Sequence, residues 1–347
     1  MSTIFDYSAI LDNRSKVLSP RVSPTVPEEF MQFVNKVAYN QLTYTATGVT
    51  GLGMGQVITD GQVPSSDAPI QGYTKSFNQV IFTERARLSQ QATYFMFNSK
   101  DGAKVDASLK DKILSLKNSI TQAKNFYMQS LLAQGASTSF TFAAINTVAV
   151  TAGTVVDTTT ADGVAYWSAS HLREDGGTNW SNLVSGSPVF SFANLLAART
   201  QHSAKKDGRG LPLIGSTLDT FVFQLNSSAY YLATSINGTI ASGKYPSASP
   251  GTSGSFVDAS PTASFKVIGT AAYGSTAPLT GTSSTNWFAF DSKMINKDTG
   301  FQYVQTLPIT ISDWKIDYVG NMDYVTTATE YCQFGAADLR YWMASLN

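Results

Sequence analysis

Charge is scarce in this sequence, and its two signs balance. Charged residues make up 14% of the 347 residues and the formal net charge is zero, whereas a typical soluble domain carries roughly 25% charged residues. A dedicated nucleic-acid binder normally shows a basic stripe, so the composition excludes that class. A neutral, weakly charged surface repels copies of itself weakly, which favours self-association.

Cysteine and long apolar runs are almost absent. The single cysteine, Cys332, excludes an internal disulfide framework. Its place in a strand-like run indicates a small buried side chain and not a reactive thiol. No window of about 18 apolar residues predicts a membrane span, and the charged N-terminal region does not resemble a signal peptide. We therefore expect an intracellular origin and no membrane partner.

The motifs of enzymes are missing as well. Residues 238–244, GTIASGK, match the first seven positions of a phosphate-binding P-loop, but Tyr245 stands where Ser or Thr must hold magnesium. The two histidines, His171 and His202, have no second ligand at metal spacing. The run HLRED after His171 is interpreted as a solvated cluster in a polar loop. We assign no catalytic residue, cofactor or metal, and expect no enzyme.

Two long periodic segments dominate what the sequence does contain. Over residues 106–134, apolar side chains recur at spacings of three and four, which predicts an amphipathic helix of about 43 Å. Asp106 is its predicted N-cap and Gly135 its stop. Residues 323–334 would extend roughly 40 Å as one strand. We expect this helix and strand to pack along each other as an elongated platform.

Shorter elements surround these two. Alternation from residue 73 predicts a strand with Val80, Phe82, Ala86 and Leu88 on one face. A short helix is predicted over 89–97, a longer one over 191–206, a strand and then a helix over 211–236, and strands at 287–290 and from 301. Residues 46–72, rich in glycine, read as a long loop or hairpin, and residues 237–285 as a loop-rich insertion.

Three quoted stretches together resemble a known family. They are FTERARLSQQA before the long helix, YWSASHLREDGGTNWSNLV with the later KKDGRGLPL, and the closing YCQFGAADLRYWMAS. In this order they resemble the HK97-like major capsid proteins of tailed phages, in particular the Mu-type major head subunits. The resemblance implies an α+β fold. Its expected parts are an N-terminal arm (1–45), an E-loop (46–76), a peripheral domain (77–185) with a spine helix (about 106–134), an axial domain (186–311) and a return strand of the peripheral domain (312–347).

The same resemblance implies a major head protein. Hexamers and pentamers of the chain would form an icosahedral shell around phage double-stranded DNA, in a virion assembled in the bacterial cytoplasm. We expect a separate scaffolding protein, since only about 45 residues precede the loop, and a portal. The absence of lysine between residues 46 and 72 predicts no covalent cross-link from the loop. The alternatives are an encapsulin-type cellular shell, a phage tail or adhesin protein and, last, an enzyme.

Charged residues supply the remaining predictions. Lysines 104, 110, 112, 117 and 124 of the long helix are candidates for non-specific DNA contact, although a solvated helix face is the favoured interpretation. We expect neighbouring copies to cover part of the closing aromatic residues. Charges that interrupt apolar runs are predicted contacts between copies, with a solvated edge as the equal alternative. These residues are Glu84, Arg85, Arg87, Lys205, Lys206, Asp207, Arg209 and Arg340.

Overall fold

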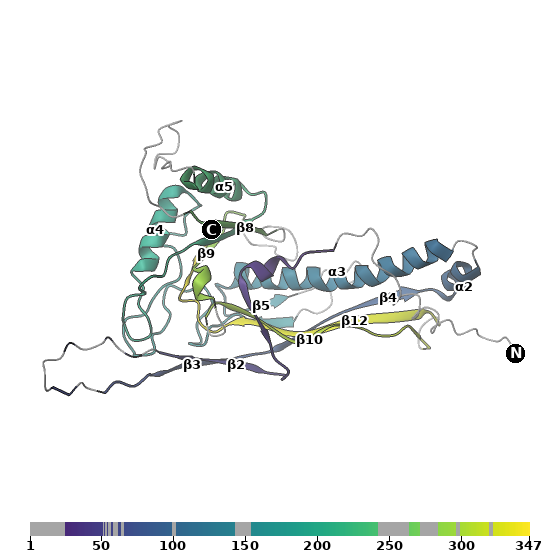
Figure 1. Ribbon diagram of the computed structural model, residues 1–347, viewed down its shortest axis with the longest axis horizontal. Coiled ribbons are helices and arrows are strands. Elements are labelled where there is room, and N and C mark those ends of the chain that lie inside the picture. The colour runs from purple at the N-terminus through teal and green to yellow at the C-terminus, as the bar shows by residue number, and fades with distance from the viewer. Residues whose placement is uncertain are drawn as a thin grey trace.

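An elongated platform forms one end of the molecule and a smaller lobe the other (Figure 1). The computed structural model describes residues 25–50, 52, 54, 57, 62–63, 66–98, 102–142, 154–241, 264–270, 284–295, 299–318 and 322–347. The chain combines helices with mostly antiparallel sheets, so the expected α+β class is confirmed.

The platform is a five-stranded sheet with a long helix on one face. β12 (Tyr324–Ala336) is its central strand. It pairs with antiparallel β10 (Phe301–Ile311) on one side and with antiparallel β4 (Gln79–Leu88) on the other. The short β11 (Lys315–Ile316) pairs with the start of β12, and β1 (Val34–Ala38) runs parallel to β10. Helix α3 (Gly102–Gln134) lies along this sheet, and α2 (Gln90–Asn98) lies at its far end.

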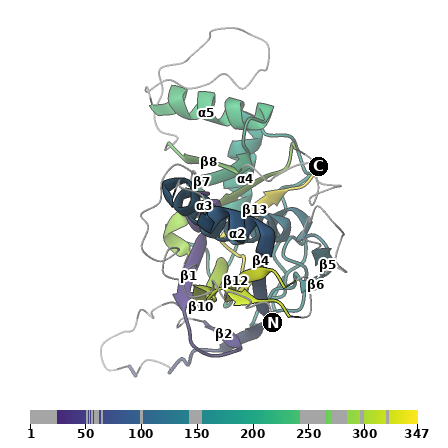
Figure 2. The same ribbon diagram turned by 90° about the vertical axis from the view of Figure 1, so that its right-hand side faces the viewer.

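The second sheet lies in the smaller lobe. Its strand order is β13 (Trp342–Ser345), β9 (Trp287–Phe290), β7 (Thr220–Gln224) and β8 (Lys266–Thr270), and only β7 and β8 are parallel. The lobe's helices are α4 (Phe192–Ser203) and α5 (Ser228–Ala241). In the end-on view of Figure 2, α5 lies above α3, and the platform sheet lies below α3.

The remaining elements are short. They are η1 (Glu29–Gln32), η2 (Ser292–Met294), the pair β2 (Tyr44–Val49) and β3 (Gln71–Phe77), and the pair β5 (Ser139–Phe142) and β6 (Thr154–Asp157).

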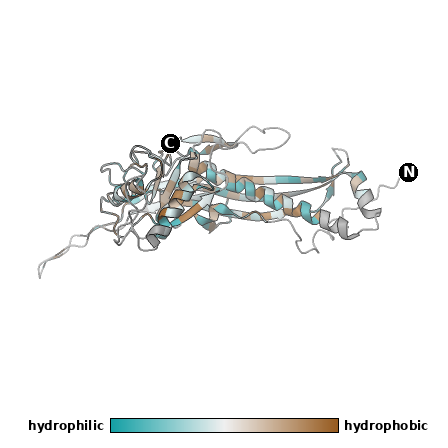
Figure 3. Ribbon diagram, turned by 90° about the horizontal axis from the view of Figure 1, so that it is seen from above, coloured by the Kyte–Doolittle hydropathy of each residue, from teal (hydrophilic) through white to brown (hydrophobic). Residues whose placement is uncertain are grey.

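Periodicity explains why α3 and β12 pair. Apolar residues on one side of α3, among them Leu116, Ile120 and Tyr127, are buried against the inward side of the sheet. Figure 3 shows hydrophobic and hydrophilic residues alternating along this helix and its neighbouring strands. The predicted platform and the stop at Gly135 are confirmed. The helix begins at Gly102, so Asp106 lies inside it and is not the N-cap.

Aromatic rings fill the centre of the platform and its boundary with the lobe. The ring of Phe334 lies 5.0 Å from that of Tyr303, 5.3 Å from Tyr127 and 5.6 Å from Phe30, measured between centroids. Trp342 is fully buried and stacks on Phe290 at 4.3 Å. These closing aromatics are covered by their own chain. The expectation that neighbouring copies cover them is therefore wrong for Phe334 and Trp342.

A buried ion pair joins the helix to the central strand. The ammonium of Lys124 on α3 lies 2.9 Å from a carboxylate oxygen of Glu330 on β12, and both side chains are almost fully buried. Glu330 also accepts hydrogen bonds from Tyr303 and from Gln305 (3.0 Å). A second carboxylate, that of Glu28, lies 2.5 Å from the same ammonium. Lys124 therefore cannot face DNA, and its expected role as a candidate DNA contact is wrong.

Two expected boundaries differ from the sheet pairing. Residues 1–24 of the predicted arm lie outside the described residues, while Phe30 and Phe33 are fully buried in the platform. β10, expected in the axial domain, belongs to the platform sheet, and β13, expected in the return strand, belongs to the lobe. Hydrogen-bond partners far along the chain decide these memberships. β8 lies within the predicted insertion 237–285, and residues 242–263 and 271–283 of that insertion lie outside the described residues.

Glu330→Gln should destabilise the chain strongly, because it removes the buried partner of Lys124 and leaves that ammonium paired only with the partly exposed carboxylate of Glu28. We expect a loss of about 3–5 kcal/mol in the free energy of unfolding, measured with denaturant. Glu28→Gln is the matched control. The Glu28 side chain is 36% exposed, so its loss should cost at most about 1 kcal/mol. Equal losses in the two variants would contradict the assignment of Glu330 as the buried partner.

Candidate functional site

A two-stranded hairpin leaves the body beneath the lobe (Figure 1). β2 and β3 pair antiparallel, and hydroxyl pairs such as Thr47 with Thr74, 3.1 Å apart, line its outer face. The segment 46–72, predicted as a long loop or hairpin, thus begins in β2 and ends in β3. Apolar residues between the two strands stay uncovered: Leu52, Met54 and Val63 are 61%, 75% and 91% exposed, and Val57 is fully exposed.

The hairpin begins on the end of the central strand. The Gln333 amide nitrogen donates to the carbonyl of Leu42 at 3.1 Å, and its oxygen accepts from the backbone N–H of Tyr44 at 2.8 Å. Phe77 packs where Gly335 leaves room, since a Cβ at Gly335 would lie 2.2 Å from the Phe77 ring. The exit direction of the hairpin is therefore set by β12.

Ion pairs then hold the hairpin against the body. We call this region the hairpin junction, made by Asp67, Tyr73 and Lys75 with Asp157, Arg173 and Arg209. Arg209 contacts both carboxylate oxygens of Asp67, one of them at 2.7 Å. Lys75 lies 2.5 Å from Asp157, and Tyr73 donates to the carbonyl of Arg173 at 3.4 Å. Three contacts from separate parts of the body thus hold β3 and the residues just before it.

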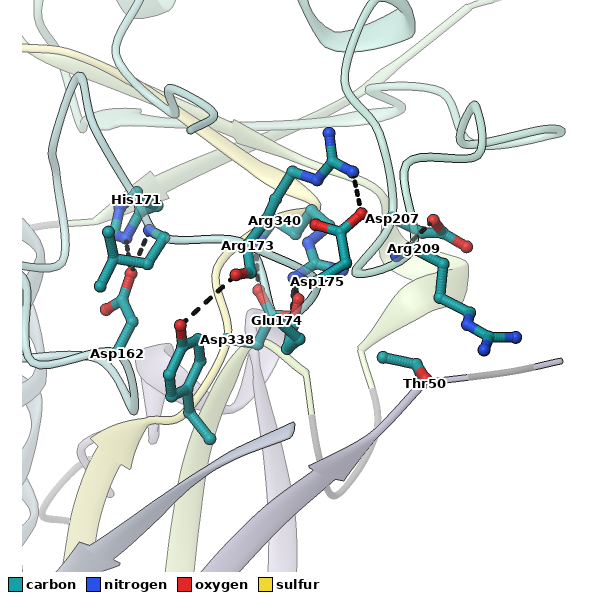
Figure 4. Close-up of polar contacts among 12 residues, drawn as sticks. Thr50, Asp162, His171, Arg173, Glu174, Asp175, Asp207, Arg209, Asp338 and Arg340 are labelled. Carbon is teal, nitrogen blue, oxygen red and sulfur yellow. Dashed lines mark hydrogen bonds and ion pairs between the residues drawn. The ribbon is translucent and has the colours of Figure 1, made fainter. Parts of the chain in front are cut away.

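A second ion pair lies between the junction and the body (Figure 4). Arg340 donates to both oxygens of Glu174, at 2.9 and 3.0 Å. Burial acts to lower the pKa of Arg340, but the carboxylates of Asp338 and Glu174 outweigh it and raise that pKa above its ordinary value. Gly208 fits between this pair and Thr50, because a Cβ there would lie 2.5 Å from Glu174 and 2.8 Å from Thr50. The turn after α4 therefore touches the hairpin closely.

The run HLRED is not a solvated cluster, and that interpretation is wrong. His171 is fully buried and stacks on Trp180 at 4.2 Å, with its Nδ1 3.0 Å from Asp162. Burial acts to raise the pKa of Asp162, but hydrogen bonds with His171 and Thr160 outweigh it and lower that pKa. The loop is thus an ordered part of the body next to the hairpin.

A cavity of about 360 Å³ lies between the hairpin junction and this loop. Its walls carry Thr50, Tyr73, Asp162, Glu174 and Arg340. Within the described part of the chain, no group of three His, Cys, Asp or Glu side chains is arranged to hold a metal ion. No helix in the described ranges is long and apolar enough to cross a membrane. The carboxylates here act as ion-pair partners that connect loops.

Comparison with known proteins finds likeness in structure only. No family model matches the chain, and no curated protein matches its sequence. The capsid of a native GTA particle is 10% identical over 94% of each chain, with a TM-score of 0.47. The capsid of Myoviridae phage XM1 is 11% identical over 96% of this chain and 95% of that chain, with a TM-score of 0.44. A chain of Mycobacterium phage Ogopogo is 10% identical over 98% of each chain, at 0.47.

These solved structures are similar to this chain, at low identity. Two of them are capsids by description, the class of protein that the three quoted stretches resemble. Because the TM-scores lie below 0.5, the function proposed below is argued from the contacts of this chain and not from theirs.

The eight residues predicted to join copies have different surroundings. Lys205 and Arg340 are buried, and their partners belong to their own chain: Lys205 donates to the carbonyls of Arg340 and Trp342 at 2.9 and 2.7 Å. Arg85 and Arg87 are more than half exposed and pair with Asp317 and Asp323. The other four are Glu84, which accepts from Ser119; Lys206, which is exposed; Asp207, which accepts from the turn backbone; and Arg209 in the hairpin junction.

Asp67, Asp157 and Asp162 were not predicted as site residues. Each lies far along the chain from its partner, or beside a residue interpreted as loop, so no local pattern marks it. The one available signal is the clustering of Asp, Thr and Gly in the runs TTTADG and KDGRG, which indicates tight turns.

Arg209→Gln should loosen the hairpin while leaving the body intact. The partner Asp67 is 40% exposed, so solvent screens the pair and the unfolding free energy should fall only slightly. Hydrogen exchange of the backbone N–H groups of 66–77 should speed up. Arg85→Gln, which breaks an exposed pair on the platform, is the control. Identical exchange in the hairpin of both variants would refute the assignment of Arg209 as a residue that holds the hairpin.

The buried His202 predicts a pH dependence of stability. Burial, and to a smaller extent the charge of Lys205, lowers the pKa of His202 to about 3, and its Nε2 lies 2.8 Å from Ser216. The unfolded chain takes up this proton near pH 6.5 and the folded chain only near pH 3. Stability should therefore fall as pH drops through this window. His202→Gln should flatten that slope in denaturant unfolding, and an unchanged slope would contradict the burial of a neutral imidazole.

Proposed function

We propose that this chain is the major subunit of a closed protein shell, of the kind that encloses a phage genome. The single observation that carries the proposal is the hairpin. Leu52, Met54, Val57 and Val63 are exposed on it, while its base is held by two ion pairs and one hydrogen bond from separate parts of the body. A segment held rigidly outward with uncovered apolar residues is suited to lie on another copy.

The energetics favour many weak contacts. Covering one such side chain contributes about 1.5–3 kcal/mol, and each copy both gives and receives a hairpin. A low surface charge adds little repulsion between copies. Contacts that are weak singly sum when each subunit is held by several neighbours, which stabilises closed assemblies over isolated pairs.

The elongated platform supports the same proposal. Its sheet has α3 on one face, whereas the outward residues of β4, among them Ile81 and Arg85, are exposed. A stiff, two-layered plate is suited to forming the wall of a shell. Hexamers and pentamers are the units by which identical subunits tile an icosahedral surface, and we propose them here. The parts expected from the family resemblance, namely arm, E-loop, peripheral domain and axial domain, belong to this proposal.

The contents and partners of the shell belong to it too. Lys117 is exposed and Lys112 is half-buried on α3, so positive charges at the surface of this helix can meet DNA without sequence preference. A separate scaffolding protein and a portal are the partners that the family resemblance implies. Assembly in a bacterial cytoplasm and residence in the virion follow from the same proposal. The role is structural, and no enzymatic activity is proposed.

Electron microscopy of the purified chain tests this function. The wild-type chain should form rings, sheets or closed shells at high concentration. The variant with Leu52, Met54, Val57 and Val63 changed to Ser should keep its folded circular dichroism and form no closed shells. Deleting residues 48–71 should have the same effect.

The matched control changes Val155 and Ile214, which are 72% and 87% exposed but lie off the hairpin, to Ser. This control should assemble as the wild type does. Normal shells from the hairpin variants would refute the role of the hairpin. A wild-type chain that stays monomeric at every concentration, with or without the scaffolding protein, would refute the function.

A further inference from the structure

A second cavity, of about 310 Å³, is lined by Trp180 and by basic side chains. It is walled by the loop that carries Arg173, Thr178 and Asn179 and by the end of α4 with Lys205 and Lys206. No carboxylate among the described residues lines it. Three cationic side chains around one hollow therefore share it with neutral amides, hydroxyls and one indole.

Lys205 is the most unusual of these cations. Its side chain is 95% buried, and its ammonium donates to two backbone carbonyls and lies 5.4 Å from the centre of the Trp180 ring. In the described ranges no carboxylate lies within ion-pair distance of it. An ammonium has three N–H donors, so one is left without an acceptor. A buried charge without a counter-ion is costly, and burial lowers the pKa of Lys205 well below its ordinary value.

Two further donors beside the cavity are unsatisfied. The indole N–H of Trp180 and the Nε–H of Arg173 are buried and have no acceptor in the described part of the chain. The other side of the Arg173 guanidinium pairs with Asp175, which fixes its orientation. Buried N–H groups without partners are rare, because such a group has lost its hydrogen bonds to water and gained none in return. These N–H groups belong to residues that line the cavity, which holds no anionic side chain of its own.

We propose that this cavity binds an oxyanion, a phosphate or a carboxylate, between Arg173, Trp180, Lys205 and Lys206. The anion supplies acceptors for the three unsatisfied donors and a counter-charge for the buried ammonium. Lys206, exposed at the rim, adds a charge that attracts the anion. The source of the oxyanion is either a free phosphate ion, which is tetrahedral, or a carboxylate side chain of a second copy, which is planar.

The probes are inorganic phosphate and acetate, each titrated against chloride at equal ionic strength while the melting temperature of the dispersed chain is followed. Phosphate stabilises proteins generally, so the informative quantity is the difference between wild type and variants. The saturable part of the shift should require about tenfold more anion in Lys206→Gln, because the variant lacks a charged hydrogen-bond donor at the cavity. Trp180→Phe, which removes the indole N–H, should raise the required anion concentration by a similar factor.

Lys315→Gln, which removes an exposed lysine on β11, is the control and should respond as the wild type does. A response to phosphate at lower concentration than to acetate identifies the phosphate source, and the reverse order identifies a carboxylate. Shifts that are the same in wild type, Lys206→Gln, Trp180→Phe and Lys315→Gln for both anions would overturn the proposal. This inference stands apart from shell formation, since it concerns the dispersed chain.

Discussion

The pairing of α3 with β12 is the contact on which the rest of the molecule depends. Its centre is the ion pair of Lys124 with Glu330, surrounded by the rings of Phe30, Tyr303 and Phe334. A buried charge pair of this kind tolerates little displacement, because a shift by one residue would turn Glu330 to the opposite face of the sheet. The pair therefore fixes the register of the helix on the sheet, and with it the place where β12 ends and the hairpin begins.

Everything functional in this chain is positioned from the end of that strand. Gln333 binds the start of the hairpin, Gly335 makes room for Phe77, and Arg340 supports the loop that carries Glu174. A single strand thus couples a rigid plate to a projecting hairpin. In the proposed shell, this rigidity would present the exposed apolar residues of the hairpin to a neighbouring copy in a fixed direction.

The elements that sequence predicts well are those whose pattern is local and long. The helix ending at Gln134, the strand over β4 and the long strand β12 follow from periodicities that span many residues. What escaped prediction depends on partners far along the chain. β8 looks like part of a Gly- and Ser-rich insertion and is a strand only because β7 pairs with it. His171 lies in a polar stretch and is buried only because Trp180 and Asp162 close around it. The sheet membership of β10 and β13 has the same cause.

The position of β12 and β13 in the chain has a consequence for how the protein is made. β12 is the centre of the platform sheet, and β13 is an edge of the lobe sheet, yet both are translated after every other strand. A nascent chain that has not passed residue 336 can complete neither sheet, and the lobe sheet also needs β13. Pairings as distant as Val34 with Phe301 slow folding further. Because the hairpin is aimed only when β12 is in place, this topology would keep incomplete chains out of the proposed shell.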